Sequence, residues 1–210
     1  GSPHGGIDAQ FVTGEPAQVK YAAWTDAPHA LDRGKRALRR TLAANGAAKV
    51  WVESSLEKVF PADDPEPAGA QTSIARVSLA KNESESFQIV FRPKEFALEL
   101  LTLRASELTD AKSGAKLGVG LERVMYYPVR IPTHFEGPTG EWPDPLPPYE
   151  PFNAPAGRCS PIWVTVRAPA NVPAGMYEGT IEASSPGMDP VIITLRAEVW
   201  DFALPKTPSL

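Results

Sequence analysis

Hydrophobic and polar residues alternate with a period of two along most of the chain from Lys49 onward. The clearest run covers residues 86–92, where Phe87, Ile89 and Phe91 fall on one side and Gln88 and Arg92 on the other. Successive side chains of a strand point to opposite faces, so each such run predicts a strand with one core face and one solvent face. Similar runs cover residues 49–52, 73–80, 98–105, 121–131, 162–167, 177–182 and 191–199.

A different pattern precedes these strands. Over residues 32–45, Leu38 and Leu42 share one helical face with Leu31, and Asn45-Gly46 is a typical helix stop. This predicts a short surface helix within an N-terminal arm of residues 7–47. Residues 1–6, which precede the arm, resemble a cloning scar. The basic residues of the helix indicate either a solvated face or an anionic partner; they are Arg33, Lys35, Arg36, Arg39 and Arg40.

The strands are separated by clusters of Gly, Pro, Asn and Asp, with no helical pattern between them. Parallel strands need long, usually helical crossovers, so the pattern favours antiparallel pairing. We therefore predict an all-β fold, a two-sheet antiparallel β-sandwich of the immunoglobulin or jelly-roll type over residues 48–204, with residues 205–210 starting a linker. The predicted core consists of Phe87, Ile89, Val164, Val166, Ile181, Ile193 and Leu195.

Proline is concentrated in one segment, since ten of the 23 prolines lie between Pro128 and Pro161. Proline fixes φ and removes a backbone donor, so this segment is predicted to be a long ordered loop. Its aromatic side chains could pin the loop to its own sheet, contact a neighbouring domain, or stack on a ligand such as a sugar ring. Asp144, between two prolines, is either a turn former or an acceptor for a partner. The candidate contact residues are Phe135, Trp142, Asp144, Tyr149 and Phe152.

Composition excludes several classes of function. The 25 acidic and 21 basic residues give a net charge of −4, which argues against nucleic-acid binding. No apolar run approaches the roughly 20 residues of a membrane-spanning helix. Cys159, the single cysteine, is predicted to be a small buried residue, so neither an internal disulfide nor a cysteine-rich zinc site is expected.

Motifs that carry chemistry are absent from the sequence. There is no Gly-x-Ser-x-Gly, and Gly118-Val119-Gly120 is followed by Arg123 where a dinucleotide fingerprint needs a third glycine. His134 has no histidine or cysteine nearby with metal-ligand spacing. We therefore assign no catalytic residue, no metal ligand and no cofactor.

An ordered set of segments resembles the N-terminal domain of glycoside hydrolase family 123 and its relatives, over residues 48–210. The first segments are Lys-Val-Trp-Val-Glu-Ser at 49–54, Lys-Val-Phe-Pro at 58–61 and Ser-Leu-Ala-Lys-Asn-Glu-Ser-Glu-Ser-Phe-Gln at 78–88. Gly-Glu-Trp-Pro-Asp-Pro-Leu at 140–146, Trp-Val-Thr-Val at 163–166 and Pro-Ala-Gly-Met-Tyr-Glu-Gly at 173–179 follow. The last is Trp-Asp-Phe-Ala-Leu-Pro-Lys-Thr-Pro-Ser-Leu at 200–210.

The resemblance implies a bacterial β-sandwich that precedes a (β/α)8 catalytic barrel in a secreted or periplasmic polypeptide. Members of the family are exo-acting β-N-acetylgalactosaminidases with substrate-assisted, retaining catalysis, and their catalytic residues are an adjacent Asp-Glu pair in the barrel. This sequence contains no Asp-Glu dipeptide. The expectation is a non-catalytic accessory domain that supports the barrel of the same polypeptide, and the alternative is an autonomous carbohydrate-binding module.

Overall fold

The computed structural model describes residues 40–41, 46–64, 73–131 and 139–206. The chain divides into two units, residues 1–33 with 129–140 and residues 34–128 with 141–210. The second unit holds nearly all the described residues, and its fold is the one given below. The described residues form strands and turns and contain no helix. Among them there is accordingly no helix that is long and apolar enough to cross a membrane.

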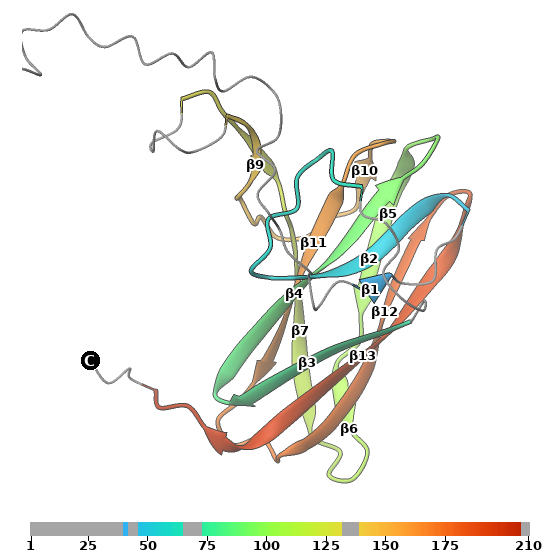
Figure 1. The fold of residues 1–210 in the computed structure, drawn as a ribbon. Helices are drawn as coiled ribbons and strands as arrows, with labels where there is room; N and C mark the ends of the chain where they lie inside the picture. The colour runs from blue at the N-terminus through green and yellow to red at the C-terminus, as the bar shows by residue number, and fades with distance from the viewer. Residues whose placement is uncertain (1–39, 42–45, 65–72, 132–138, 207–210) are drawn as a thin grey trace, which may run out of the picture. The chain divides into compact units, whose positions relative to one another are not determined.

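Strands account for most of the second unit (Figure 1). In chain order they are β1 (Arg40–Thr41), β2 (Ala48–Ser54), β3 (Ile74–Lys81), β4 (Glu83–Pro93), β5 (Leu98–Ala105), β6 (Leu108–Asp110), β7 (Lys116–Arg123), β8 (Tyr126–Val129), β9 (Gly140–Pro143), β10 (Phe152–Ala154), β11 (Ser160–Ala168), β12 (Gly175–Ser185) and β13 (Met188–Ala203).

The strands do not separate into the two packed sheets that the sequence predicts. They form one 11-stranded sheet whose path runs β1-β2-β4-β11-β7-β6-β12-β13-β3. Off this path, β5 pairs with β12 and β10 pairs with β5, and β8 pairs with β9 in a small second sheet. β6 joins the two halves because it pairs with both β7 and β12. All pairs with a known register are antiparallel except β13 and β3, which are parallel, so the purely antiparallel expectation is wrong at that position.

The last strand of this path is tied to the third strand by a single residue. Asn82 joins β3, the last strand of the path, to β4, the third, and it has a left-handed φ of 62°. Consecutive Cα atoms are about 3.8 Å apart, so the ends of these strands cannot separate by more than two such steps. The sheet must therefore curve around a core, and Figure 1 shows β3 and β4 diverging from their shared turn.

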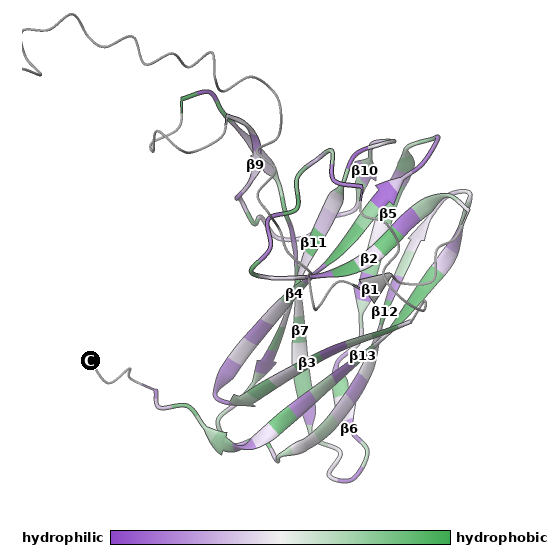
Figure 2. Ribbon diagram, in the orientation of Figure 1, coloured by the Kyte–Doolittle hydropathy of each residue, from purple (hydrophilic) through white to green (hydrophobic). Residues whose placement is uncertain are grey.

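The core inside this curved sheet contains every residue that the sequence predicts for it. Phe87, Ile89, Val164, Val166, Ile181, Ile193 and Leu195 belong to one buried cluster. Figure 2 shows hydrophobic and hydrophilic residues alternating along the long strands. The prediction that Cys159 is buried is also confirmed.

β4 departs from the alternation because both of its faces are buried. Val90 belongs to a second, smaller apolar cluster with Trp51, Val59 and Cys159, on the side opposite the main core. Gln88, predicted to face solvent, is 2% exposed, and its amide donates to the carbonyls of Ser54 and Glu57. The segment after β2 covers this face, which a period-two pattern cannot anticipate.

Two predicted elements differ from the observed ones. The helix expected over 32–45 lies mostly outside the described residues, but Arg40–Thr41, which belong to it, form a strand paired with β2. The long strand expected over 121–131 is broken into β7 and β8, and Met125 and Ile131 are exposed rather than facing a core. The break is held by the proline-rich loop, because the N–H of Met125 donates to the carbonyl of Pro145.

Truncation of Phe87 tests the assignment of the core face. Phe87 is 5% exposed, so Phe87→Ala should lower the free energy of unfolding by about 3–5 kcal/mol in a denaturant melt. Phe96→Ala, at a side chain that is 79% exposed, is the matched control and should change it by less than about 0.5 kcal/mol. Equal losses in the two variants would contradict the assignment.

Asn82 tests the link between β3 and β4. Asn82→Ala should lower the free energy of unfolding by about 1–2 kcal/mol, because a Cβ-bearing residue without a locally bonding side chain is strained at a left-handed φ. Asn82→Gly keeps the backbone freedom and loses only the side-chain hydrogen bond to the carbonyl of Leu204, so its loss should stay below about 1 kcal/mol. The difference between the two variants, measured by thermal and denaturant melts, isolates the strain.

Candidate interaction surfaces

Tyr149 and Phe152 tie the proline-rich loop to the main sheet. The hydroxyl of Tyr149 donates to the carbonyl of Leu101 at 2.6 Å and accepts from the N–H of Leu103 at 2.9 Å. Its ring meets Phe152 edge to face, and the guanidinium of Arg123 lies 3.8 Å from the centre of the Phe152 ring. Burial raises the pKa of Tyr149, so the phenol stays neutral and keeps its donor. These two candidate residues therefore face the chain's own sheet.

Trp142 lies at the other end of the same loop and is half-buried. Its ring meets Phe60 edge to face at 5.3 Å, and the carbonyl of the next residue, Pro143, accepts from Lys58 at 3.1 Å. Asp144 is exposed, and its N–H donates to the carbonyl of Met125. Phe135, the remaining candidate, lies outside the described residues.

Cys159, a member of the smaller apolar cluster, is bonded to the segment after β2 and to β8. The thiol of Cys159 donates to the carbonyl of Asp63, its N–H donates to the carbonyl of Pro61, and its own carbonyl accepts from the hydroxyl of Tyr126. Burial raises the pKa of Cys159 to about 12. The thiol is therefore neutral at physiological pH and serves packing rather than nucleophilic chemistry.

Exposed apolar side chains gather where β7 passes into β8 and contacts the loop. We call Met125, Tyr127 and Leu146 the loop surface; they are 42%, 62% and 39% exposed. The N–H of Met125 bonds to the carbonyl of Pro145, so two of its elements are held next to each other. The sequence predicts the aromatic residues of this loop as contacts, whereas the exposed apolar surface includes Met125, which the pattern assigns to the core face of a strand.

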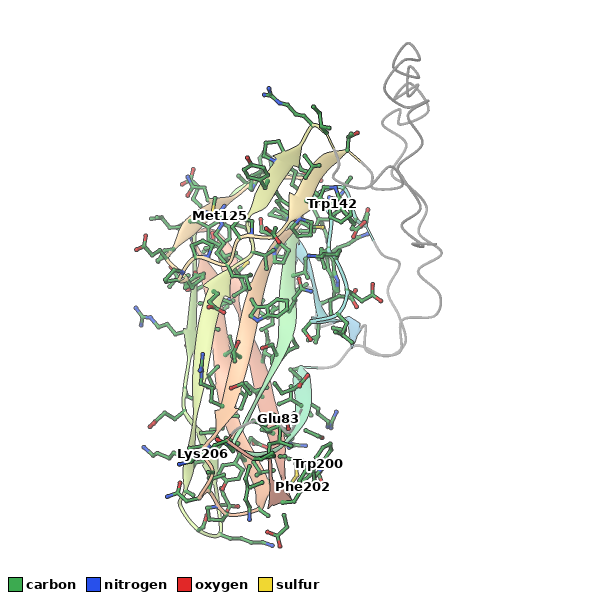
Figure 3. All side chains as sticks on the ribbon, turned by 90° about the vertical axis from the view of Figure 1, so that its left-hand side faces the viewer. Glu83, Met125, Trp142, Trp200, Phe202 and Lys206 are labelled. Atoms are coloured by element: carbon green, nitrogen blue, oxygen red, sulfur yellow. The ribbon has the colours of Figure 1, made fainter. Side chains whose placement is uncertain are left out.

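A second exposed apolar surface lies at the end of β13, and the sequence prediction misses it. Trp200 and Phe202 stack with ring centroids 5.8 Å apart and planes 19° from parallel, and Leu204 follows. We call these three the β13-end surface; they are 43%, 53% and 39% exposed. Figure 3 shows Trp200 and Phe202 side by side, far along the sheet from Met125 and Trp142. The sequence does contain a sign of this surface, because Trp200, Phe202 and Leu204 alternate with smaller or polar residues.

The β13-end surface is fixed by the turn between β3 and β4. The ammonium of Lys81 pairs with Asp201 at 2.6 Å, and the carbonyl of Lys81 accepts from the N–H of Leu204. The side-chain amide of Asn82 donates to the carbonyl of Leu204 at 3.0 Å. These bonds fix the backbone around Asp201, so the direction of its neighbours Trp200 and Phe202 is fixed as well.

The divergence of β3 and β4 leaves a hollow of about 260 Å³ beside the end of β2. Val52, Val77 and Phe87 supply apolar lining, and Glu85 lies at the same opening. Burial, and then the nearby charge of Glu83, raise the pKa of Glu85. The carboxylate of Glu83 itself accepts from the N–H of Ala80.

Within the part of the chain that the structure describes, no three His, Cys, Asp or Glu side chains are arranged to hold a metal ion. The assembled features are ordered surfaces with apolar side chains, held by hydrogen bonds and ion pairs. Such surfaces can dock a partner or stack on a ligand, and they offer no nucleophile with a base beside it.

Comparison with known proteins gives a fold likeness but no sequence relative. No family model and no curated protein matches the sequence. Among solved structures, a family 123 glycoside hydrolase from Clostridium perfringens, described for the hydrolysis of glycolipid glycans, shares the fold with a TM-score of 0.66 and 16% identity. The likeness covers 76% of this chain and 28% of that one. The PapD-like domain 7 of human CEP192 matches at a TM-score of 0.37 and 8% identity, over 76% and 90% of the two chains, too low for any argument.

Tyr149 provides the test of how the loop is attached. Tyr149→Phe should lower the free energy of unfolding by about 1–3 kcal/mol, because the carbonyl of Leu101 and the N–H of Leu103 both lose their phenol partner. Tyr127→Phe removes a hydroxyl from a side chain that is 62% exposed and should have an effect below about 0.5 kcal/mol. If the two variants melt alike in urea, the loop does not depend on this anchor.

Proposed function

We propose that this chain is a non-catalytic accessory domain of a bacterial glycoside hydrolase of the family 123 type, which packs on and supports a (β/α)8 catalytic barrel of the same polypeptide. The observation that carries the proposal is the fold likeness to the clostridial enzyme, which extends over 28% of that enzyme's chain. Because the likeness is confined to that share, most of the clostridial enzyme lies outside it and can form a separate catalytic part. The ordered segments of residues 48–210 that resemble the family's N-terminal sandwich domain support the same proposal.

The β13-end surface is the contact that we assign to the barrel. Trp200 and Phe202 lie near the end of β13 and Leu204 follows it, and the Lys81–Asp201 pair and the Asn82 amide fix the direction of the chain there. Apolar side chains that are 39–53% exposed lose unfavourable contact with water when a neighbouring domain covers them. The loop surface and Trp142 are the second contact, in line with the expectation from the sequence.

The substrate and the location follow from the same proposal. The clostridial enzyme acts on glycolipid glycans. We assign the parent polypeptide of this chain to glycans with β-linked N-acetylhexosamine, in a secreted or periplasmic enzyme of carbohydrate metabolism.

One observation favours a second candidate, an autonomous carbohydrate-binding module. Trp200 and Phe202 are half-exposed and nearly parallel. Flat aromatic faces are suited to stacking on sugar rings, so the same pair could bind glycan without a barrel. The two candidates make opposite predictions for the chain alone.

The test begins with the purified chain. It should show no turnover of an aryl β-N-acetylgalactosaminide and no heat of binding with N-acetylgalactosamine oligosaccharides. In the longer polypeptide, Trp200→Ser with Phe202→Ser should lower the melting temperature of the catalytic part or raise KM, because the covering contact is lost. Phe96→Ser, at an aromatic position that is 79% exposed and lies away from β13, is the control.

Each candidate has a result that rejects it. Sugar binding by the chain alone that disappears in the Trp200→Ser variant would replace the accessory role with the binding module. Turnover by the chain alone that survives repurification would reject both. Unchanged kinetics and melting of the longer polypeptide in the double variant would exclude the β13-end surface as the contact, and Trp142→Ala then tests the loop.

A further inference from the structure

The hollow between β3 and β4 has an apolar wall that belongs to the core. Val52 at the end of β2 and Phe87 of β4 line it and are members of the main buried cluster, and Val77 of β3 packs against that cluster. The volume of about 260 Å³ exceeds the roughly 10–15 Å³ that one water needs, and it lies just below the range of about 300–1,000 Å³ for drug-sized ligands. The hollow is therefore suited to one small molecule or one long side chain.

Most of the polar side chains that line the hollow are already bonded within the fold. They are Glu53, Ser54, Ser78 and Ser86, and their partners are, in that order, the N–H of Ser54, the N–H of Leu56, the carboxylate of Glu198 and the hydroxyl of Thr165. Two charged side chains of the lining remain, Glu85 and Arg76.

Glu85 lacks a cation within the part of the chain that the structure describes. Burial and then the charge of Glu83 raise its pKa, and the group that opposes them is the backbone N–H of Ser86. Arg76 is exposed and does not lower the pKa of Glu85. A cation that enters the hollow would favour the charged form of this carboxyl group and would replace part of the water that burial removes from it.

We propose that the hollow binds a primary ammonium group on a short, unbranched apolar stem, with the ammonium on the carboxylate of Glu85 and the stem against Val52, Val77 and Phe87. The stem fits the apolar wall because its burial removes apolar surface from water. A neutral or anionic ligand would leave the carboxylate without a counter-charge. Two sources supply this chemistry, a free alkylamine and a lysine side chain of a partner polypeptide.

A titration of the full chain with n-pentylamine at neutral pH tests the site. The nuclear magnetic resonance signals of Val52, Val77 and Phe87 should shift with one common Kd. n-Pentanol has the same stem without the charge, so it should bind about tenfold or more weakly, because a charge-assisted hydrogen bond is lost.

Glu85→Gln keeps the size of the side chain and removes its charge. It should raise the Kd for n-pentylamine by about tenfold or more. Glu95→Gln, at an exposed glutamate outside the hollow, is the matched control and should leave the Kd unchanged. The melting temperature of Glu85→Gln should not fall, because the replaced carboxylate is partly desolvated and has no cation beside it. Loss of binding in this variant is thereby separated from loss of the fold.

A third probe, Nα-acetyl-lysine methylamide, separates the two sources. Tighter binding of this probe than of n-pentylamine assigns the hollow to a lysine of a partner polypeptide, and the opposite order assigns it to a free amine. Equal binding of n-pentylamine and n-pentanol, unshifted signals at the three lining residues, or equal Kd values in the two glutamine variants overturn the proposal. Such a failure leaves the accessory role untouched, because that role is tested at Trp200 and Phe202.

Discussion

The fold depends on the one-residue link at Asn82. β3 and β4 lie far apart along the path of the sheet, yet their ends cannot separate by more than two peptide units. A flat sheet of this order is impossible, so the strands must curve until the path returns on itself. The curvature encloses the main core, and it also explains why β3 finds its partner in β13, the strand that arrives last and runs parallel to it. A left-handed φ at Asn82 is the local cost of this arrangement.

The same link connects the fold with the surface that we assign to function. Lys81 and Asn82 hold Asp201 and Leu204, so the residue that closes the sheet also directs the end of β13. A domain that supports a neighbour needs a defined exit rather than a flexible one, because each freedom left in the connection must be lost again when the domains dock. The stacked Trp200 and Phe202 are therefore presented from a strand end that is bonded to the β3–β4 turn.

The sequence predicted the elements that depend on local alternation and missed those that depend on distant segments. The core faces of β4, β11, β12 and β13 follow from period two, because burial of one face acts on each strand separately. Three other features depend on which distant segments come into contact, and a local pattern of residues does not contain that information. They are the parallel β3–β13 pair, the second buried face of β4 and the strand at Arg40–Thr41. For the candidate site, the sequence singled out the aromatic residues of the proline-rich segment, and the structure turns two of them, Tyr149 and Phe152, onto the sheet. The last glycine of the Pro-Ala-Gly-x-Tyr-x-Gly segment is required by packing. A Cβ at Gly179 would lie 2.8 Å from the carbonyl oxygen of Glu107, which is too close for a larger residue.

The electrostatics of the described residues tie most of the shifted carboxylates to the fold. A general acid at neutral pH needs a carboxyl group with a raised pKa that can reach a substrate. Most of the described carboxylates with a shifted pKa have a lowered pKa, because a hydrogen-bonding partner stabilises the charged form. They are Asp64 beside Lys49, Glu141 beside Arg158, Asp201 beside Lys81 and Asp110 beside Ser113. Each is committed to holding a turn, a loop or a strand end. Glu85 alone among these shifted carboxylates has a raised pKa, and its neighbour Glu83 is bonded to the backbone of Ala80. Glycoside hydrolysis requires two carboxyl groups, or one with a substrate acetamide, arranged across a bound sugar, whereas burial is the main cause of the raised pKa of Glu85.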